Sequence, residues 1–403
     1  MDSRPNRLKD VAARLLARDE KPKLLVVCIS NSWGGLEQVA VNDATDVTQS
    51  GIEVRMLCLK GSPVYEHIVK AGLIRPVPLA KSPRNTLDFG LKRILEDQVL
   101  DGVNLVHTHQ TTLLGSLSPW LSKFPHVGLV ASRHILNNHS KKNPFHLLVY
   151  RRVDALVVMS QALRENVLAT HPVSAEKVVL IKLGLDFEKF SPDRVDPTEQ
   201  RKKWGAEPDT VVIGLVGRID PAKGQSTFIL AGAGTVKHLK SGQKVKFVIV
   251  GEETLGSSGG YLSELQALVK QFHLEDHVIF AGYQENIPEV MRAMDIFVMP
   301  SRQEAFGLVA IEAMAMECPI IISSGGSASE IVGRQEFGLL MRAEDAFDLQ
   351  QQMKRLLDFP TVRKQMGKKA REHVRMNYDR ELRQIESLEL YERILNSRTK
   401  ARR

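Results

Sequence analysis

Two glutamates eight residues apart are the first candidates for chemistry. Glu304 and Glu312 lie in the stretch Glu-Ala-Phe-Gly-Leu-Val-Ala-Ile-Glu, which follows an apolar run of strand length and leads into a helical pattern. Eight helical residues would separate the carboxylates by roughly 12 Å along one face, but Glu304 falls in the turn before the helix. Glu312 needs a partner within its apolar surroundings, because glutamate is almost never buried alone. A ribose diol would serve, while amide groups near Gly307 and Leu308 would face a phosphate.

Two cations follow another strand-like run. Arg218 and Lys223 belong to the segment Gly-Arg-Ile-Asp-Pro-Ala-Lys-Gly, directly after the apolar residues 211–216. Ligands of doubly wound sheets bind at the carboxyl ends of the strands, which is where these side chains are expected. A guanidinium and an ammonium group together suit a diphosphate whose negative charge grows as it leaves. The alternative is that both are solvated surface charges.

A pair of glycines, Gly34 and Gly35, separates the first strand-like run from a helical pattern. Paired glycines let the backbone approach a ligand closely, and the following helix N-terminus attracts an anion. The pair is not the G-x-G-x-x-G fingerprint, so a dinucleotide cofactor is not favoured. A purely structural turn is the alternative here.

The remaining pattern supplies the elements that must position these residues. Short β-branched runs alternate with amphipathic segments of helix length, which is typical of parallel sheets covered on both faces. The expected strands are 24–29, 54–59, 103–107, 127–132, 155–159, 178–181, 211–216, 246–250, 277–281, 296–299, 319–323 and 338–341. A dozen strands exceed what one open sheet usually carries, so the fold class is α/β with two Rossmann-like, doubly wound domains.

A chain of 403 residues is too long for one hydrophobic core, which also favours two domains. We expect a first domain at 1–186, a polar, proline-punctuated linker at 187–209, and a second domain at 210–378. We expect residues 379–403 to form a C-terminal helix that returns to the first domain. Near the start of the chain, Leu8, Val11 and Leu15 share one apolar stripe. This helix either packs on its own domain or lies on a membrane surface.

Composition sets broad limits on location and partners. Hydrophobic residues make up 43% and charged residues 25% of the chain, as in an ordinary globular protein. No run suits a membrane span or a signal peptide, so we expect a cytoplasmic protein, at most peripheral at the inner membrane face. Cys28, Cys58 and Cys318 have no metal-ligand spacing and are expected in the cores. Nucleic acid is not an expected partner.

The positive charge of the chain is concentrated in its first half. Residues 1–190 hold 25 Lys and Arg against 18 Asp and Glu, whereas the remainder is nearly balanced. The basic residues that suggest an anionic acceptor or membrane surface are Lys81, Arg84, Lys92, Arg93, Arg133, Lys141, Lys142, Arg151 and Arg152. A solvated basic face without a partner is the alternative.

Taken together, these segments resemble the retaining GT-B glycosyltransferases of glycosyltransferase family four. The Gly-Gly turn, the Gly-Arg…Lys-Gly segment, Val-Ile-Phe-Ala-Gly at 278–282, the two-glutamate element and a final helix with Leu390 and Tyr391 occur in family order. The resemblance implies two Rossmann-like domains facing a central cleft. It also implies retaining transfer of a hexose-type sugar from a nucleotide-diphosphate sugar to a glycan, lipid-linked or other hydroxyl acceptor, in the manner of cell-envelope glycan synthesis. Neither a cofactor nor a divalent metal is expected.

The resemblance assigns roles residue by residue. The catalytic residues would be His134, Glu304, Arg218 and Lys223. The donor would be bound by Gly34, Gly35, Arg218, Lys223, Gly282, Tyr283, Ile287, Glu304, Ala305, Phe306, Gly307, Leu308 and Glu312. His109 and Arg133 would line the acceptor side. Both histidines follow strand-like runs, and a structural role is the alternative for a histidine at a strand end.

Two departures from the family pattern lie at 183–186, where Leu-Gly-Leu-Asp replaces Asn-Gly-Val-Asp, and at 250–253, where Val-Gly-Glu-Glu lacks a second glycine. Both put fine donor recognition in doubt more than the reaction type. Two other functions stay open, a nucleotide-sugar 2-epimerase of the same fold and a non-catalytic nucleotide-sugar-binding subunit. A nicotinamide dehydrogenase is disfavoured by the missing fingerprint.

Overall fold

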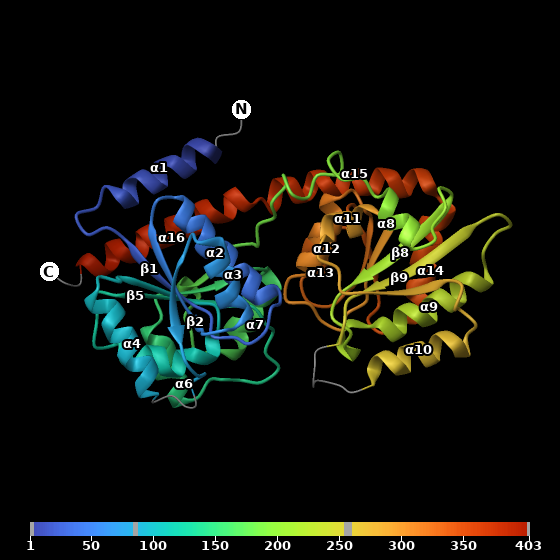
Figure 1. Ribbon diagram of the computed structural model, residues 1–403. Helices are drawn as coiled ribbons and strands as arrows, with labels where there is room; N and C mark the ends of the chain where they lie inside the picture. The colour runs from blue at the N-terminus through green and yellow to red at the C-terminus, as the bar shows by residue number, and fades with distance from the viewer. Residues whose placement is uncertain (1–3, 84–87, 254–259, 401–403) are drawn as a thin grey trace. The chain divides into compact units, whose positions relative to one another are not determined.

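The protein consists of two compact units (Figure 1). The structure, a computed structural model, describes residues 4–83, 88–253 and 260–400, so Arg84 lies outside the described residues. One unit comprises Met1–Gly184 with Arg380–Arg403, and the other comprises Leu185–Asp379. The expectation of two Rossmann-like α/β domains is confirmed. The central cleft between them stays a prediction.

The first unit contains a parallel sheet in the order β3-β2-β1-β4-β5-β6-β7. Its strands are β1 (Lys23–Val27), β2 (Glu53–Leu59), β3 (Arg75–Leu79), β4 (Leu105–Thr108), β5 (Gly128–Arg133), β6 (Ala155–Val158) and β7 (Val178–Leu180). The direction of strand succession reverses between β1 and β4. Loops that leave neighbouring strands at such a switch point diverge and leave room for a ligand.

The second unit contains a parallel sheet in the order β10-β9-β8-β11-β12-β13. Its strands are β8 (Thr210–Val216), β9 (Lys244–Val250), β10 (Val278–Gly282), β11 (Ile296–Met299), β12 (Ile320–Ser323) and β13 (Leu339–Met341). Here the switch point lies between β8 and β11. The candidate cations follow β8 and the Glu304 turn follows β11, so both groups leave the sheet at this point.

Helices connect the strands in both units. The first unit has α1 (Arg4–Leu16), α2 (Gly35–Gln49), α3 (Pro63–Ala71), α4 (Phe89–Leu100), α5 (Leu114–Leu121), α6 (Pro144–Arg152), α7 (Gln161–Thr170) and α16 (Arg380–Lys400). The second has α8 (Thr198–Lys203), α9 (Gln225–Lys237), α10 (Tyr261–Gln271), α11 (Ile287–Arg292), α12 (Leu308–Ala315), α13 (Ala328–Val332), α14 (Ala346–Asp358) and α15 (Pro360–Asn377). Short 3₁₀ turns occur at Thr111–Leu113, Ala175–Lys177 and Pro221–Lys223.

Strand β3 was not among the expected strands. Its sequence, Arg-Pro-Val-Pro-Leu, contains two prolines, which cannot donate to a β-ladder. Because Pro76 and Pro78 are two residues apart, their nitrogens face the same side, and among the described strands β3 lies at the edge of the sheet beside β2. The open edge thus tolerates the prolines that hid the strand.

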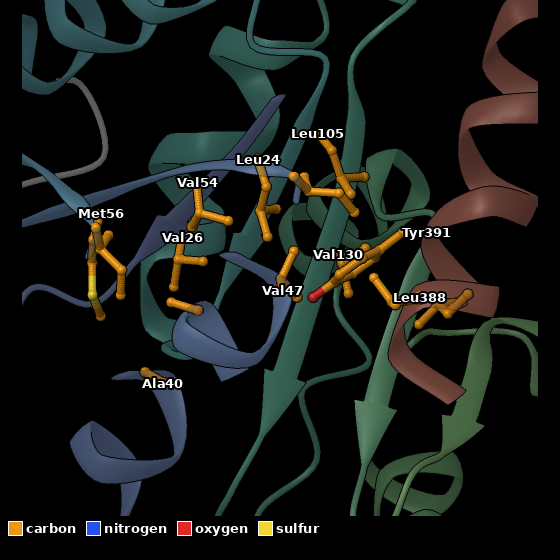
Figure 2. Packing of buried hydrophobic residues seen from close by; sticks show 14 of the residues in the cluster. Leu24, Val26, Ala40, Val47, Val54, Met56, Leu105, Val130, Leu388 and Tyr391 are labelled. Atoms are coloured by element: carbon orange, nitrogen blue, oxygen red, sulfur yellow. The ribbon is translucent and has the colours of Figure 1, made fainter. Parts of the chain in front are cut away.

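Helix α16 completes the core of the first unit. Its residues Leu388 and Tyr391 pack in one cluster with Val130 of β5 and Leu105 of β4, as Figure 2 shows. Helix α1 lies along α16, burying Val11 and Leu15. The basic side of α1 is held there as well, by the ion pairs Arg7–Glu389 (2.8 Å) and Arg14–Glu392 (2.9 Å). Of the two alternatives for the N-terminal helix, the structure therefore shows packing on its own domain.

The chain passes between the units twice, and the two passages pair with each other. Leu185 forms an isolated parallel bridge with Asp379, and the Leu185 N–H donates to the Tyr378 carbonyl (2.7 Å). Residues 187–209, expected as a linker, belong to the second unit. Within them, Arg201 of α8 donates to the Thr210 carbonyl (2.6 Å) and contacts the carboxylate of Asp295 (3.0 Å). These contacts attach α8 to the start of β8 and to the residue that precedes β11.

Candidate functional site

In the second unit, a cation and a carboxylate meet beyond the switch point. The Lys223 Nζ lies 2.6 Å from the Glu304 Oε1, although the two residues are 81 positions apart in the sequence. Both side chains are partly exposed, so the pair is within reach of a ligand. The structure thus brings together two of the residues that the sequence assigned to the reaction.

The turn that carries Lys223 is built around Asp220. One carboxylate oxygen of Asp220 accepts from the Ala222 N–H (2.9 Å), and the other contacts the Arg218 Nη2 (2.9 Å). Arg218 remains largely exposed, whereas its backbone carbonyl accepts from the Gln225 side chain (2.8 Å). Asp220 therefore fixes the turn and holds Arg218 beside it, leaving guanidinium donors available for an anion.

The turn that carries Glu304 precedes α12 and is clamped by a second glycine turn. Gly307 caps α12 with a left-handed backbone (φ 88°), so the N–H groups of the first helical turn begin at Leu308. After β12, Ser327 donates through its N–H to the Glu304 carbonyl (3.2 Å) and through its hydroxyl to the Phe306 carbonyl (2.6 Å). At Gly326 (φ 63°), a Cβ would lie 2.0 Å from the Glu304 carbonyl oxygen. The backbone that presents Glu304 thus depends on a glycine at 326.

Glu312 lies in the middle of α12 and is half-buried. Burial raises the pKa of its carboxyl to about 7, although the positive charge of Lys189 opposes this rise. Within the described ranges the Glu312 carboxyl has no hydrogen-bond partner. Its oxygens are therefore available to the ribose hydroxyls that the sequence analysis assigned to them. It does not pair with Glu304, Arg218 or Lys223.

The remaining donor-side candidates lie at the end of β10 and the start of α11. Gly282 has a left-handed backbone (φ 65°), Tyr283 is exposed, and Ile287 begins α11. The Tyr283 N–H donates to the carboxylate of Glu252 (3.2 Å), and the Glu252 carbonyl accepts from the Ile219 N–H (3.0 Å). Glu252 therefore connects the ends of β8, β9 and β10 within the segment 250–253, which lacks the second glycine of the family pattern.

In the first unit, three histidines stack behind the ends of β4 and β5. The His107 and His109 rings lie 4.5 Å apart and the His109 and His134 rings 5.4 Å apart. Burial lowers the pKa of His107 to about 4 and that of His134 to about 3, and it lowers the pKa of His109 well below its ordinary range. All three imidazoles are therefore neutral at pH 7.

The contacts of His109 set the proton positions in this stack. Its Nδ1 lies 3.3 Å from the His134 Nε2, and its Nε2, buried and without a hydrogen bond, lies 3.8 Å from the Asp43 carboxylate. A proton on the His109 Nε2 faces this negative charge favourably, whereas a lone pair there would be repelled. His109 then accepts through Nδ1 from the His134 Nε2–H, which leaves the His134 Nδ1 as an acceptor.

Arg133 and the glycine pair have different surroundings. The buried Arg133 donates to the Ile135 carbonyl (2.7 Å) and the Thr111 hydroxyl (2.8 Å), so its side chain holds the loop after β5. The Gly34 N–H donates to the Glu37 carboxylate (2.9 Å) at the start of α2. Gly34 has an extended backbone, and a Cβ on Gly35 would meet nothing within 4 Å. At position 35, therefore, neither backbone strain nor packing within the unit requires the residue to be a glycine.

Two family models match the chain, one in each unit. Residues 33–189 match the model of glycosyltransferase family 4, and residues 196–373 match that of the glycosyl transferases group 1. The chain belongs to this family of GT-B glycosyltransferases. The first model covers the Gly34–Gly35 turn and the histidine stack, and the second covers the Lys223–Glu304 pair.

Among known proteins, the chain is similar to the lipopolysaccharide core biosynthesis mannosyltransferase LpsB of Rhizobium meliloti (strain 1021), with 35% identity over 40% of this chain and 45% of LpsB. The chain spans about half the length of three curated relatives that it matches, 45%, 52% and 44%. In fold it is similar to a glycosyltransferase from Rickettsia africae ESF-5 (TM-score 0.83, 19% identity, 93% and 99% of the two chains). It is also similar to Anabaena Alr3699/HepE in complex with UDP and glucose (TM-score 0.79, 21% identity, 92% and 99%).

Three residues that the sequence did not indicate, Asp43, Gly326 and Ser327, contact the candidate site residues His109 and Glu304 or their backbone. Gly326 and Ser327 follow β12 in the sequence Ser-Ser-Gly-Gly-Ser, a glycine pair after a strand of the same kind as Gly34-Gly35. Asp43 carried no signal, because it lies inside a helix and its partners are distant in sequence. In the part of the chain that the structure describes, no three His, Cys, Asp or Glu side chains gather as a metal site.

Proposed function

We propose that this chain is a retaining, metal-independent glycosyltransferase that moves a hexose-type sugar from a nucleotide-diphosphate sugar to a hydroxyl acceptor. The observation that carries the proposal is the Lys223–Glu304 contact of 2.6 Å beyond the switch point of the second sheet. A sugar nucleotide carries both a diphosphate, which requires a cation, and an electron-poor anomeric centre, which a carboxylate stabilises. These two needs are met by adjacent side chains.

In the proposed complex, the second unit binds the donor. Lys223 and Arg218 contact the diphosphate, and the first amide groups of α12 face the phosphate next to the sugar. The diphosphate draws Lys223 away from Glu304, which releases the carboxylate for the sugar. Glu312, with its raised pKa and its lack of a hydrogen bond within the described ranges, accepts from the ribose hydroxyls. Tyr283, Gly282 and Ile287 contact the base.

In the first unit, we propose that Gly34 and Gly35 approach the donor phosphate and that His109 and His134 serve the acceptor side. The open space at Gly35 supports this role, because the glycine there is needed by nothing in its own unit. The neutral His134 presents the lone pair of its Nδ1, so the group that it binds is a hydroxyl that donates. Arg133 then acts through the loop after β5 rather than through contact with the acceptor.

The proposed reaction takes place on one face of the sugar. The acceptor hydroxyl oxygen forms a bond to the anomeric carbon as the bond from that carbon to the diphosphate oxygen breaks. The bonding electron pair leaves with the diphosphate, and one of its oxygens takes the hydroxyl proton. Lys223 and Arg218 stabilise the charge that develops on the leaving group, and Glu304 stabilises the oxocarbenium-like sugar.

For the substrates, we propose a UDP-sugar as the first donor to examine and a cell-envelope glycan, free or lipid-linked, as the acceptor class. The fold neighbour HepE binds UDP and glucose, and LpsB carries a name from lipopolysaccharide core synthesis. The excess of basic residues in the first half of the chain supports an anionic acceptor.

The test compares Lys223→Met with Lys240→Met. Lys240 pairs with Asp358 (3.0 Å) near the amino end of β9, so its loss removes an ion pair away from the site. After a thermal-shift screen of UDP-, GDP- and ADP-sugars has identified the donor, we expect Lys223→Met to lower kcat/KM about 10²- to 10³-fold. Lys240→Met should match the wild type. The anomeric configuration of the product is determined by NMR, and the assay is repeated with EDTA.

Several outcomes would overturn parts of the proposal. Equal activity of Lys223→Met and wild type removes the role of the cation. An inverted product excludes the retaining mechanism, and loss of activity in EDTA that added Mg²⁺ restores excludes metal independence. An epimerised sugar nucleotide formed without any acceptor identifies the epimerase instead.

A further inference from the structure

Helix α6 of the first unit buries one face and exposes leucines on the other. Val149 and Tyr150 are buried, whereas Leu147 and Leu148 are 57% and 68% exposed and Phe145 is 51% exposed. A helix on the surface of a soluble domain normally carries polar side chains opposite its buried face. The outer face of this nine-residue helix thus carries apolar side chains, although a face in contact with water alone normally carries polar ones.

Two aromatic rings extend this surface over neighbouring helices. Helix α5 packs against both α4 and α6, and Figure 1 shows α4 and α6 at the outer edge of the first unit. Phe89 of α4 is 72% exposed, and its ring lies 6.4 Å from that of Trp120 in α5. Lys92 and Lys123 stand over the Trp120 ring, with Nζ atoms 5.1 and 5.3 Å from its centre. Apolar groups and cations therefore share this side of the unit.

The charged residues within α6 and in the segment before it are all positive. Residues 133–153 contain five Lys and Arg and no Asp or Glu. Arg133 and Arg152 are used internally, the latter on the Val127 carbonyl (2.6 Å) and Asp154 (3.4 Å). Lys142 and Arg151 are exposed and have no ion-pair partner among the described residues. Arg151 lies one turn after Leu147 and Leu148, so a cation borders the apolar face directly.

We propose that the outer face of α4–α6, named here the α6 face, docks on an anionic lipid bilayer. The face consists of Phe89, Trp120, Phe145, Leu147 and Leu148, with Lys92, Lys123, Lys142 and Arg151 around them. Leucine and phenylalanine side chains enter the boundary between headgroups and acyl chains, while lysine and arginine contact the anionic headgroups. The Trp120 ring lies beneath the ammonium groups of Lys92 and Lys123, so apolar and cationic groups adjoin within the face.

The chemistry favours a bilayer over a protein partner. The apolar side chains project from the outer side of a helix, and a fluid layer accepts projecting groups without pockets of matching shape. Lys142 and Arg151, which have no ion-pair partner among the described residues, suit a surface of uniform negative charge. None of the described helices has the length and apolar character that a membrane crossing requires. Docking through the α6 face does not require a spanning helix, because the face would lie on the membrane surface.

The experiment measures binding of the full chain to vesicles by co-sedimentation at physiological salt. One set of vesicles contains phosphatidylcholine with phosphatidylglycerol, and the other contains phosphatidylcholine alone. We expect binding to the anionic set and little to the neutral set. Leu147→Ser with Leu148→Ser should weaken binding at least about tenfold, because the serines no longer transfer apolar surface from water into the bilayer. Lys142→Glu with Arg151→Glu should also weaken it about tenfold or more.

The matched control is Phe347→Ser in α14 of the second unit. Phe347 is 65% exposed, like the leucines of α6, but it does not belong to the α6 face, so its variant should bind as the wild type does. Absence of binding to anionic vesicles by the wild type would overturn the proposal. Equal binding to both vesicle sets, or full binding by the double leucine variant, would do so as well. Vesicle binding does not depend on sugar transfer, so this result and that of the activity assay are separate.

Discussion

Asp43 of α2 and Arg383 of α16 form a buried, bidentate ion pair, with 2.7 Å between Oδ1 and Nε and 2.6 Å between Oδ2 and Nη2. Arg383 also donates to the carbonyls of Ile181 (3.2 Å) and Lys182 (2.9 Å). One guanidinium therefore joins α2, the end of β7 and the C-terminal helix. The same Asp43 carboxylate faces His109, so the pair connects the packing of α16 with the histidine stack.

The first prediction concerns the stability that this pair provides. Asp43→Asn leaves the Arg383 charge buried without its partner, and we expect a loss of about 3–5 kcal/mol in the free energy of unfolding. Asp46→Asn is the matched control, since it breaks the neighbouring Asp46–Arg380 pair (2.6 Å), in which the arginine side chain is 31% exposed rather than 6%. That loss should be about 1 kcal/mol or less. Urea unfolding followed by circular dichroism measures both, and equal losses would contradict the argument.

The second prediction concerns the protons of the histidine stack. We expect His109 and His134 to carry their single protons on Nε2 at pH 7, because Asp43 attracts the His109 Nε2–H and His109 Nδ1 accepts from His134. Nitrogen-15 chemical shifts of the imidazoles distinguish the two tautomers directly. In Asp43→Asn the preference of His109 should weaken, while in Asp46→Asn it should remain. A protonated Nδ1 on His134 in the wild type would contradict the assignment.

The third prediction concerns pH and Glu312. Its pKa is about 7 in the folded chain against an ordinary 4.5, so between these values the folded state binds a proton that the unfolded state has released. Stability must then fall as pH rises through this range, since stability increases with pH only where the unfolded state binds more protons. We expect Glu312→Gln to remove this part of the slope of melting temperature against pH. An identical slope in the variant would show that other groups cause it.

The fourth prediction concerns the clamp behind Glu304. In Gly326→Ala the new Cβ would lie 2.0 Å from the Glu304 carbonyl oxygen, so the turn must move and both stability and activity should fall. Gly61→Ala is the control, because Gly61 has a similar left-handed backbone (φ 73°) with nothing within 4 Å of its Cβ position. We expect about 1–2 kcal/mol for the backbone strain alone in Gly61→Ala and more in Gly326→Ala. Melting curves and donor-binding titrations measure the difference.

The sequence predicted the parts of the fold that follow from local pattern. Of the thirteen strands in the described ranges, twelve were expected within a few residues, because parallel strands are short apolar runs between helical segments. Strand β3 escaped because Pro76 and Pro78 contradict the strand pattern, and only its place at the edge of the sheet permits them. The segment around α8 was taken for a linker because its attachment through Arg201 to β8 depends on contacts that polar sequence does not reveal.

For the candidate site, sequence located residues at strand ends but not their contacts. Glu304 and Lys223 were found separately, since each follows a predicted strand, while their pairing depends on β8 and β11 being neighbours. Arg133 was assigned to the acceptor side by its position, yet its side chain holds the loop after β5. Asp43 was missed because its partner Arg383 is 340 residues away, and no local pattern connects the two.

The place of α16 has a consequence for synthesis of the chain. Its residues Leu388, Leu390, Tyr391, Ile394 and Leu395 belong to the same core as the strands and helices of residues 11–181. A ribosome adds them only after the whole second unit has been made, so the domain that starts first is finished last. Until then the nascent protein exposes the apolar surface that α16 will cover, which makes this interval the time when a chaperone has most reason to bind it.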